Sequence, residues 1–180
     1  MYSVEELEAF CERIHSTPFY LLLSYLGAGS LQSDHIASHV GKAVGLSLFL
    51  RTCLAMSRNA AARSADPGLP LDLLSTGGIS QQRLLEGGVE GWRSETVRNI
   101  VHRLANAAMG HADLAREHLA AASRHDRPIL QRLFLPMAPT RLFLQALNEA
   151  DFDLTHGELY RRDRWLPLRL LWTLARGDAP

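Results

Sequence analysis

Arg51 is the residue whose chemistry its own neighbourhood explains least. It follows the apolar run GLSLFL (45–50), uncharged residues continue after it to Ser57, and no acidic residue lies between Asp34 and Asp66. A guanidinium is costly to bury unless an anion or a carboxylate meets it. The sequence therefore raises the question of whether Arg51 binds an anionic ligand or is held by groups from elsewhere in the chain.

The histidines are the next residues that could do chemistry. His35 and His39 are four residues apart, as the zinc ligands of an HExxH motif are, but Ile36 stands where that motif has its general base. Three more histidines recur every seventh residue, and neighbours two helical turns apart lie about 10 Å from one another, too far to share one metal ion. We therefore expect no metal site and a structural role for His35, His39, His111, His118 and His125.

Neither a nucleophile nor a cofactor-binding loop is indicated. Cys11 and Cys53 stand in apolar surroundings without a CxxC pair, which is typical of free thiols in a core. The sequence has no G-x-S-x-G motif. The stretches GAGS (27–30) and GGIS (77–80) are too short for a phosphate-binding loop. We expect no cofactor.

Composition sets the broad class of protein. The 180 residues are 47% hydrophobic and 21% charged with no formal net charge, which is enough apolar material for one domain with a real core. Balanced charge argues against nucleic acid as a partner, because phosphate binding needs a concentrated excess of Lys and Arg. No uninterrupted apolar stretch reaches the ~18 residues of a membrane span. The acidic start MYSVEELEAF differs from a signal or transit peptide.

Helical signals run along the chain, and no alternating pattern predicts a strand. Ser3 and Glu6 form a capping box before the first helix, which Pro18 should kink or break. Residues 34–51 predict a helix, capped by Ser33 or Asp34, in which small residues recur every fourth position and allow another helix to approach closely. Further helices are expected at 80–87, 94–124, 128–150 (interrupted at Pro136 and Pro139) and 165–176, and 57–80 is the loosest segment. The predicted fold class is all-α.

The last predicted helix, WLPLRLLWTLAR (165–176), is amphipathic. Its apolar face could pack into the core, or it could lie on a membrane surface with Trp165 and Trp172 as interfacial anchors. The sequence leaves both alternatives open.

Four segments, in this order, resemble the squalene/phytoene synthase family: STPFYLLLSYLG, SDHIASHVGKAVGLSLFLRT, GLPLDLLSTGGIS and ADFDLTHGELYRRDRWLPLRLLW. The resemblance extends from about residue 7 to about residue 176 and is strongest to a mitochondrial branch that acts in the assembly of respiratory complex I. It implies an all-α isoprenoid-synthase-like helical bundle and one domain over residues 1–180, corresponding to the C-terminal portion of the family pattern. We therefore expect a bundle that is incomplete on its N-terminal side.

The resemblance also gives Arg51 a context. In the enzymes of the family, an arginine at this position precedes a D-x-x-x-D motif whose carboxylates hold Mg²⁺ and the substrate diphosphate. Here the two aspartate positions fall on Thr52 and Met56, and the glutamate between them falls on Ala55. Threonine offers one weak oxygen ligand and methionine none to a hard cation. The resemblance thus implies a degenerate diphosphate and magnesium site at Arg51, Thr52, Ala55 and Met56, with no catalytic residue and no metal.

A groove for an isoprenoid tail is implied by the same comparison. The small Ala-Gly pair that makes room for the tail in the enzymes falls on Leu23 and Ser24, and the bulk of Leu23 would narrow any channel. Tyr20, Gly41 and Gly45 complete the residues that we expect to line such a groove.

The expected function is therefore non-catalytic. The resemblance implies a protein that acts in mitochondria, peripherally on the matrix side of the inner membrane, in the assembly of NADH:ubiquinone oxidoreductase. Its partners would be complex I subunits or other assembly factors, and it would bind a partner subunit or a lipid-like ligand. Its import signal would lie outside this chain. The alternative is a prenyl-diphosphate transferase of the squalene/phytoene synthase type, which would need the missing aspartates.

Without a metal cluster beside it, Arg51 should be structural. Its helix is expected to end near this residue, where the helix dipole favours a cation. Its five N–H donors would bond to Ser47, to backbone carbonyls, or to Asp66 or Asp72 in the following loop.

Overall fold

The computed structural model describes residues 3–58, 68–160 and 164–176, and every regular element in these ranges is helical. This confirms the predicted all-α fold class. In chain order the elements are α1 (Val4–Cys11), the π-helical turn η1 (Glu12–Ser16), α2 (Thr17–Tyr25), α3 (Leu31–Arg58), α4 (Leu71–Thr76), α5 (Gln81–Glu86), α6 (Gly88–Arg93), α7 (Glu95–Ala120), α8 (Arg127–Leu133), α9 (Met137–Glu149), the 3₁₀ turn η3 (Gly157–Tyr160) and α10 (Leu166–Arg176).

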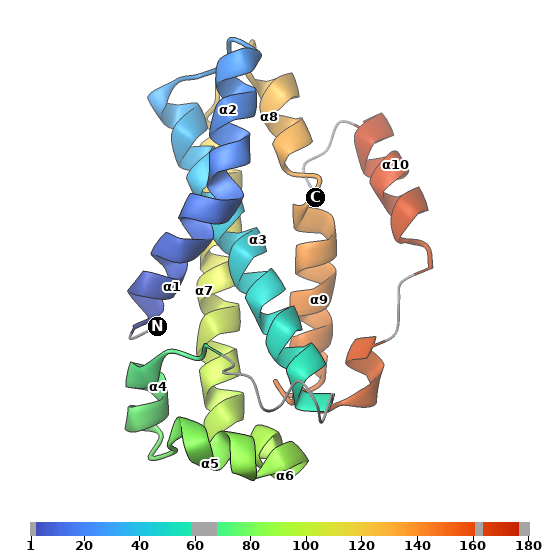
Figure 1. The fold of residues 1–180 in the computed structure, drawn as a ribbon. Helices are drawn as coiled ribbons and strands as arrows, with labels where there is room; N and C mark the ends of the chain where they lie inside the picture. Colours follow the sequence, from blue (N-terminus) through green and yellow to red (C-terminus); the bar gives the residue numbers. More distant parts are fainter. Residues whose placement is uncertain (1–2, 59–67, 161–163, 177–180) are drawn as a thin grey trace.

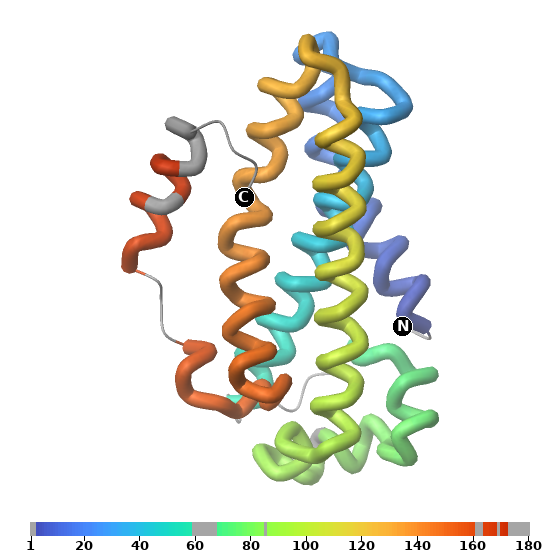
Figure 2. Tube along the Cα trace, turned by 180° about the vertical axis from the view of Figure 1, so that it is seen from behind, coloured from blue at the N-terminus to red at the C-terminus, as the bar shows by residue number. Residues whose placement is uncertain are grey.

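The long helix α3 is the centre of the bundle (Figure 1). It packs along α7 and also contacts α1, η1, α2, α8 and α9. The two long helices are antiparallel, because Gln32 near the start of α3 donates to the carbonyl of His118 near the end of α7 (3.2 Å). Seen from behind (Figure 2), α9 runs beside α7. By length and composition alone α3 could cross a membrane, but 56% of its most apolar window is buried inside the protein, so here it serves as the core helix.

Small residues on α3 let η1 approach closely, as their four-residue spacing predicts. A Cβ added to Gly41 would overlap Ser16 Oγ and lie 2.7 Å from the backbone nitrogen of Ser16. A Cβ on Gly45 would lie 2.6 Å from the Cβ of Cys11. Real Cβ atoms do not come this close to neighbouring atoms, so the packing of η1 on α3 depends on both glycines.

Helix α3 begins earlier than predicted. The side chain of Ser30 accepts the backbone N–H of Ser33 (3.1 Å), so Ser30 caps this end rather than Ser33 or Asp34. Three more residues therefore join the first turn, beginning at Leu31.

Helix α3 also continues past Arg51 to Arg58. The residues beyond Arg51 include Cys53 and Leu54, both buried in the core. Their burial stabilises the extra turns, because helices in proteins are held mostly by the packing of their apolar face. The predicted helix end at Arg51 is therefore wrong.

The first helical segment changes its winding just before Pro18. The side chain of Ser3 accepts the N–H of Glu6 (3.2 Å), as the capping box predicts. Further along, residues Glu12–Ser16 form a π-helical turn, and the Thr17 hydroxyl donates to the carbonyl of Arg13 (2.6 Å). Because Pro18 has no N–H to give to the preceding turn, a widened turn at this place accommodates it.

Serines and prolines define most of the remaining helix starts. The side chains of Ser80 and Ser94 cap α5 and α7, and Pro128 lies in the first turn of α8, all as predicted. Pro136 separates α8 from α9, but Pro139 lies inside the first turn of α9, where no intrahelical N–H is needed. The predicted interruption at Pro139 is therefore wrong. One face of α7 is buried at Val97, Val101, Leu104, Ala108 and Ala115, and Ala122 is buried just beyond the helix.

Candidate functional site

The four positions predicted to correspond to the magnesium site of the enzymes point in different directions from α3. Arg51, Thr52 and Ala55 are exposed, whereas Met56 is only 8% exposed and packs in the core. The Thr52 hydroxyl donates to the carbonyl of Leu48 in its own helix (3.0 Å). Within residues 3–58, 68–160 and 164–176, no group of three His, Cys, Asp or Glu side chains is arranged to hold a metal ion.

Arg51 joins α3 to α9. Its Nη2 donates to the carbonyl of Pro139 (2.9 Å), and its guanidinium carbon lies 4.3 Å from the centre of the Phe143 ring. Burial lowers the pKa of Arg51, but arginine stays charged at neutral pH because its ordinary pKa lies so far above neutrality. Arg51 therefore bonds within the protein, to α9.

A backbone carbonyl is among the partners predicted for Arg51, but the observed one belongs to Pro139 of α9 and not to the end of its own helix. The carboxylate of Asp72 instead accepts the N–H of Leu73 (2.7 Å) at the start of α4. Ser47 is buried on α3, and Asp66 lies outside the described residues. A partner more than eighty residues away in sequence could not be identified from helical spacing.

An apolar cavity of about 540 Å³ lies beside Arg51. Its volume falls within the roughly 300–1,000 Å³ of small-molecule sites. Its charged lining residues are Arg51 and Glu158, so a mostly apolar molecule with one polar group would match its chemistry. The lining consists of Arg51, Pro139, Leu142, Phe143, Ala146, Glu158, Leu159, Tyr160, Leu166 and Pro167.

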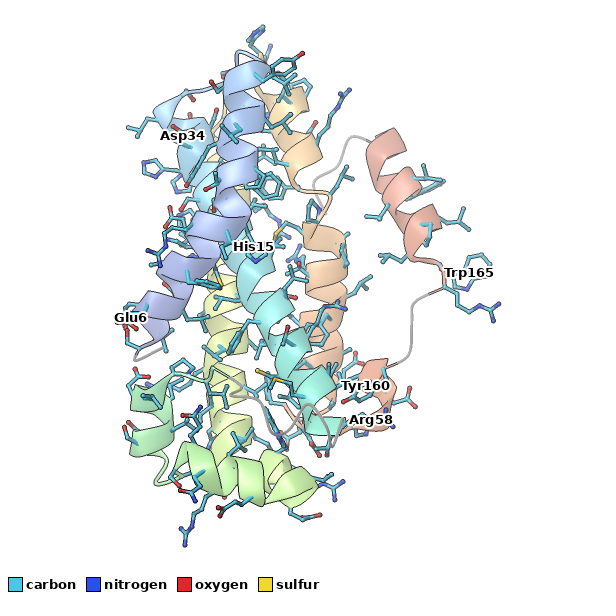
Figure 3. The ribbon with its side chains drawn as sticks, viewed as in Figure 1. Glu6, His15, Asp34, Arg58, Tyr160 and Trp165 are labelled. Atoms are coloured by element: carbon cyan, nitrogen blue, oxygen red, sulfur yellow. The ribbon has the colours of Figure 1, made fainter. Side chains whose placement is uncertain are left out.

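The turn η3, which lines one side of this cavity, is fixed to the end of α3. The Tyr160 hydroxyl donates to the carbonyl of Leu54 (2.7 Å), and the Ser57 hydroxyl donates to the carbonyl of Leu154 (3.2 Å). The guanidinium of Arg58 lies 4.1 Å from the centre of the Tyr160 ring, and Figure 3 shows the two side chains together. Burial raises the pKa of Tyr160, so its hydroxyl stays protonated as a donor.

The residues predicted to line a groove lie at the packed contact of η1 and α2 with α3. Leu23 is fully buried, Ser24 is exposed, and Tyr20 donates its hydroxyl to a carboxylate oxygen of Glu12 (3.1 Å). Gly41 and Gly45 face η1, as described above. The structure thus gives each of them a packing or surface position, and their role in lining a groove stays a prediction.

The structure assembles a histidine cluster that the sequence did not predict. His35 and His39 from α3 meet His111 and His118 from the antiparallel α7. The His39 ring stacks on His118 with ring centres 5.6 Å apart, and the His35 ring also stacks on His118, with ring centres 6.0 Å apart. The Nδ1 atoms of His39 and His111 are 3.0 Å apart, and Nε2 of His111 lies 3.5 Å from a carboxylate oxygen of Glu8.

The surroundings of His39 and His111 favour the neutral form of both imidazoles. Burial, followed by the charges of His111, His118, Lys42 and His35, lowers the pKa of His39 to about 4. Burial also lowers the pKa of His111, although Glu8 opposes that shift. His111 can therefore connect Glu8 to His39 by hydrogen bonds, and the rings of His39 and His111 resist taking up a proton.

An ion pair between Lys42 of α3 and Glu12 of η1 lies near the histidine cluster. Lys42 lies 3.0 Å from Glu12, which also accepts hydrogen bonds from Ser38 (2.8 Å) and Tyr20. Burial raises the pKa of Glu12, but these hydrogen bonds outweigh it and hold the pKa below its ordinary value. Glu12 is therefore a charged carboxylate that balances Lys42.

Spacing along one helix could not reveal the cluster. His111 and His118 are seven residues apart and too distant to contact each other directly. On the facing helix, His39 contacts them both and His35 contacts His118. The signal that could have found it is the combination of an i, i+4 pair with an i, i+7 pair on two helices known to be antiparallel.

The two thiols are buried and free, as predicted. Burial raises the pKa of Cys11 to about 11 and that of Cys53 to about 12. Both therefore remain protonated at neutral pH and are poor nucleophiles.

The structure is an all-α bundle built around one long central helix, as expected for an isoprenoid-synthase-like fold. The chain matches the squalene/phytoene synthase family over residues 1–172 and belongs to that family. No solved structure matches it significantly.

The similar curated proteins are named as assembly factors. The chain is 36% identical over 172 residues to the NADH dehydrogenase (ubiquinone) complex I, assembly factor 6 homolog of Drosophila melanogaster, a match that covers 94% of this chain and 47% of that protein. It is 32% identical over 168 residues to NADH dehydrogenase (ubiquinone) complex I, assembly factor 6 of Bos taurus, covering 93% of this chain and 46% of that protein. The chain spans about half the length of the curated relatives it matches.

Proposed function

We propose that this protein is a non-catalytic factor in the assembly of respiratory complex I and that it acts by binding. The observation that carries the proposal is its similarity, at 30% to 36% identity, to proteins named as complex I assembly factors in insects, mammals and an amoeba. By the same similarity, the proposed location is the mitochondrion, peripherally on the matrix side of the inner membrane. The proposed partners are complex I subunits or other assembly factors.

The chemistry of the degenerate site supports binding rather than catalysis. A Mg²⁺–diphosphate bridge needs paired carboxylates on one helix face. The corresponding positions carry Thr52, whose hydroxyl bonds to its own helix, Ala55, and Met56, which packs in the core. Arg51, which would face a diphosphate, is engaged with Pro139 and Phe143 instead.

A lipid-like ligand is the second form of binding that we propose, with the cavity beside Arg51 as its site. The lining of this cavity is mainly apolar, with the Arg51 guanidinium and Glu158 as its charged groups. An acyl or prenyl chain with one polar end would suit such a lining. The predicted groove at Tyr20, Leu23, Ser24, Gly41 and Gly45 is less suited, because Leu23 and the two glycines are occupied by helix packing.

The assembly role can be tested by affinity capture from mitochondria. The chain, fused to a mitochondrial import sequence and an affinity tag, is expressed in insect cells depleted of the endogenous assembly factor 6 homolog. Captured proteins are compared with those captured by an unrelated matrix protein carrying the same tag. We expect enrichment of complex I subunits or other assembly factors, and native gels report whether assembled complex I rises. Enrichment of neither group would overturn the proposal.

A further inference from the structure

Helix α10 exposes an apolar face that the bundle does not cover. Trp165, Leu168, Leu171 and Trp172 are 65%, 55%, 61% and 60% exposed. Positions 165, 168 and 172 follow one another at three and four residues, so they form one stripe along the helix, with 171 at its edge. Arg169, four residues after Trp165 and three before Trp172, lies on the same side of the helix. A short amphipathic helix is usually stabilised by burial of its large apolar side chains. The four side chains of this stripe are instead mostly exposed.

The placement of α10 leaves this face directed away from the core. Figures 1 and 2 show α10 standing beside α9 at a distance from the rest of the bundle. Its first residues, Leu166 and Pro167, line the cavity that also contains Arg51. Trp165 projects outward from the molecule (Figure 3). The start of the segment thus lies against the bundle at Leu166 and Pro167, whereas Trp165 faces outward.

The charge of this segment indicates the kind of surface that would cover the stripe. Residues 161–178 include five arginines and two aspartates, so this flank has an excess of positive charge, and Arg164 is exposed. Tryptophan is the side chain most typical of the boundary between lipid headgroups and acyl chains, because its ring is apolar and its N–H is polar. Arginine is attracted to the phosphates of anionic lipids. Tryptophan together with an excess of arginine is the combination that suits an anionic headgroup layer.

We propose that the outer face of α10 docks on an anionic lipid bilayer, lying in the interfacial plane with Trp165 and Trp172 inserted at headgroup level. This inference deepens the peripheral membrane location proposed above by naming the surface responsible. The stripe supplies apolar burial, and the cationic flank supplies selectivity for anionic lipid. Docking on the outer face leaves Leu166 and Pro167 on the cavity side.

The test uses the purified 180-residue chain with vesicles of phosphatidylcholine alone or with added phosphatidylglycerol. We expect sedimentation with the anionic vesicles to exceed sedimentation with neutral ones about tenfold and to weaken as salt is added. Tryptophan emission gives a second readout. Trp92 is already fully buried, so a blue shift on adding anionic vesicles reports Trp165 and Trp172.

Matched variants locate the binding surface. The double substitution Trp165→Ala and Trp172→Ala should reduce binding to anionic vesicles about tenfold or more and abolish the blue shift. Leu21→Ser removes an equally exposed apolar side chain (68%) from α2 and should leave binding unchanged. Circular dichroism checks that both variants keep the helical bundle.

Three results would overturn the proposal. The first is that the parent chain does not bind anionic vesicles. The second is that the double variant binds them as well as the parent does. The third is that the parent chain forms a dimer without lipid and the double variant is a monomer. The last would assign the stripe to a second copy of the chain. Because the vesicle experiment contains no complex I component, its failure leaves the assembly role untouched, and failure of the affinity capture leaves vesicle binding untouched.

Discussion

The Nδ1 atoms of His39 and His111 face each other at 3.0 Å across the contact of α3 with α7. A hydrogen bond at this distance needs one N–H and one lone pair, so the pair is suited to two neutral rings of opposite tautomer at Nδ1. A proton on both Nδ1 atoms would set two N–H groups against each other. The packing of the two longest helices is therefore coupled to the protonation of this pair.

Stability should consequently fall in mild acid. The pKa of His39 is about 4 in the folded protein and 6.5 as its ordinary value, so the unfolded chain binds the proton more readily between these values. The stability associated with neutral His39 is complete above pH 6.5 and is lost as the pH falls toward 4. We expect a loss on the order of 1–3 kcal/mol in the free energy of unfolding, allowing for the partial exposure of the ring.

Chemical denaturation at pH 7 and pH 4.5 measures this loss, with His39→Gln as the test variant. Carboxyl groups also titrate in this range, so the informative quantity is the difference in pH dependence between the parent and the variant. His39→Gln cannot take up a proton and should lose less stability on acidification than the parent. His125→Gln, an exposed histidine outside the cluster, is the control and should behave as the parent does. Identical pH dependence in all three proteins would contradict the prediction.

Arg51 should contribute to stability through its contacts with α9. Arg51→Met keeps the length and apolar stem of the side chain but loses the bond to the Pro139 carbonyl and the charge over Phe143. We expect a decrease of about 1–2 kcal/mol in the free energy of unfolding. Arg103→Met, at an exposed position on α7, should change it by less than about 0.5 kcal/mol.

Thermal and denaturant unfolding of both arginine variants provide the measurement. A ligand role would give a different pattern from a structural one. If Arg51→Met were as stable as the parent but lost binding of an anionic amphiphile, Arg51 would be a ligand contact of the adjacent cavity and the structural assignment would fail.

Local sequence signals predicted the helices well and their contacts less well. The serines that cap α1, α5 and α7 act through atoms within three residues, so the sequence alone identifies them. The close approach of η1 to α3 also follows from a local pattern, the spacing of small residues. The end of α3 did not follow, because burial of Cys53 and Leu54 against distant segments outweighs a charge at position 51.

The candidate site depended on contacts that only the fold supplies. The bond from Arg51 to Pro139 and the meeting of His39 with His111 join residues that are 88 and 72 positions apart. Helical periodicity fixes which face a residue occupies but not which helix packs against that face. The hypothesis that positions 51–56 correspond to a magnesium site came from the resemblance to the squalene/phytoene synthase family. Composition and spacing alone do not indicate it.

The substitutions at the degenerate site predict an absence of prenyl transfer. With geranylgeranyl or farnesyl diphosphate and Mg²⁺ or Mn²⁺, the chain should release no pyrophosphate and form no phytoene or squalene, because Thr52, Ala55 and Met56 provide no carboxylate pair for the metal. Addition of Mg²⁺ should likewise not strengthen binding of a non-hydrolysable prenyl diphosphate analogue. A heat-treated sample is the blank and an active synthase the positive control. Product above the blank would favour the prenyl-transferase alternative.

Two glycine-to-alanine substitutions should shift stability in opposite directions. At Gly41 the added methyl group would overlap Ser16 Oγ and crowd the backbone of η1, so the helices must separate. We expect Gly41→Ala to lower the free energy of unfolding by about 1–3 kcal/mol. At Gly110 on α7 nothing lies within 4 Å of an added Cβ. There alanine removes only the entropic cost of glycine in a helix and should raise stability by about 0.5–1 kcal/mol.

The pair tests whether close packing of η1 on α3 holds the first helices in place. Both substitutions are chemically identical and both lie within helices, so a difference in sign can only come from their surroundings. Denaturant midpoints with unchanged slopes would report the two effects as changes in stability. If Gly41→Ala stabilised the protein as Gly110→Ala does, η1 would not be in contact with α3 at Gly41, and this part of the bundle would be packed differently.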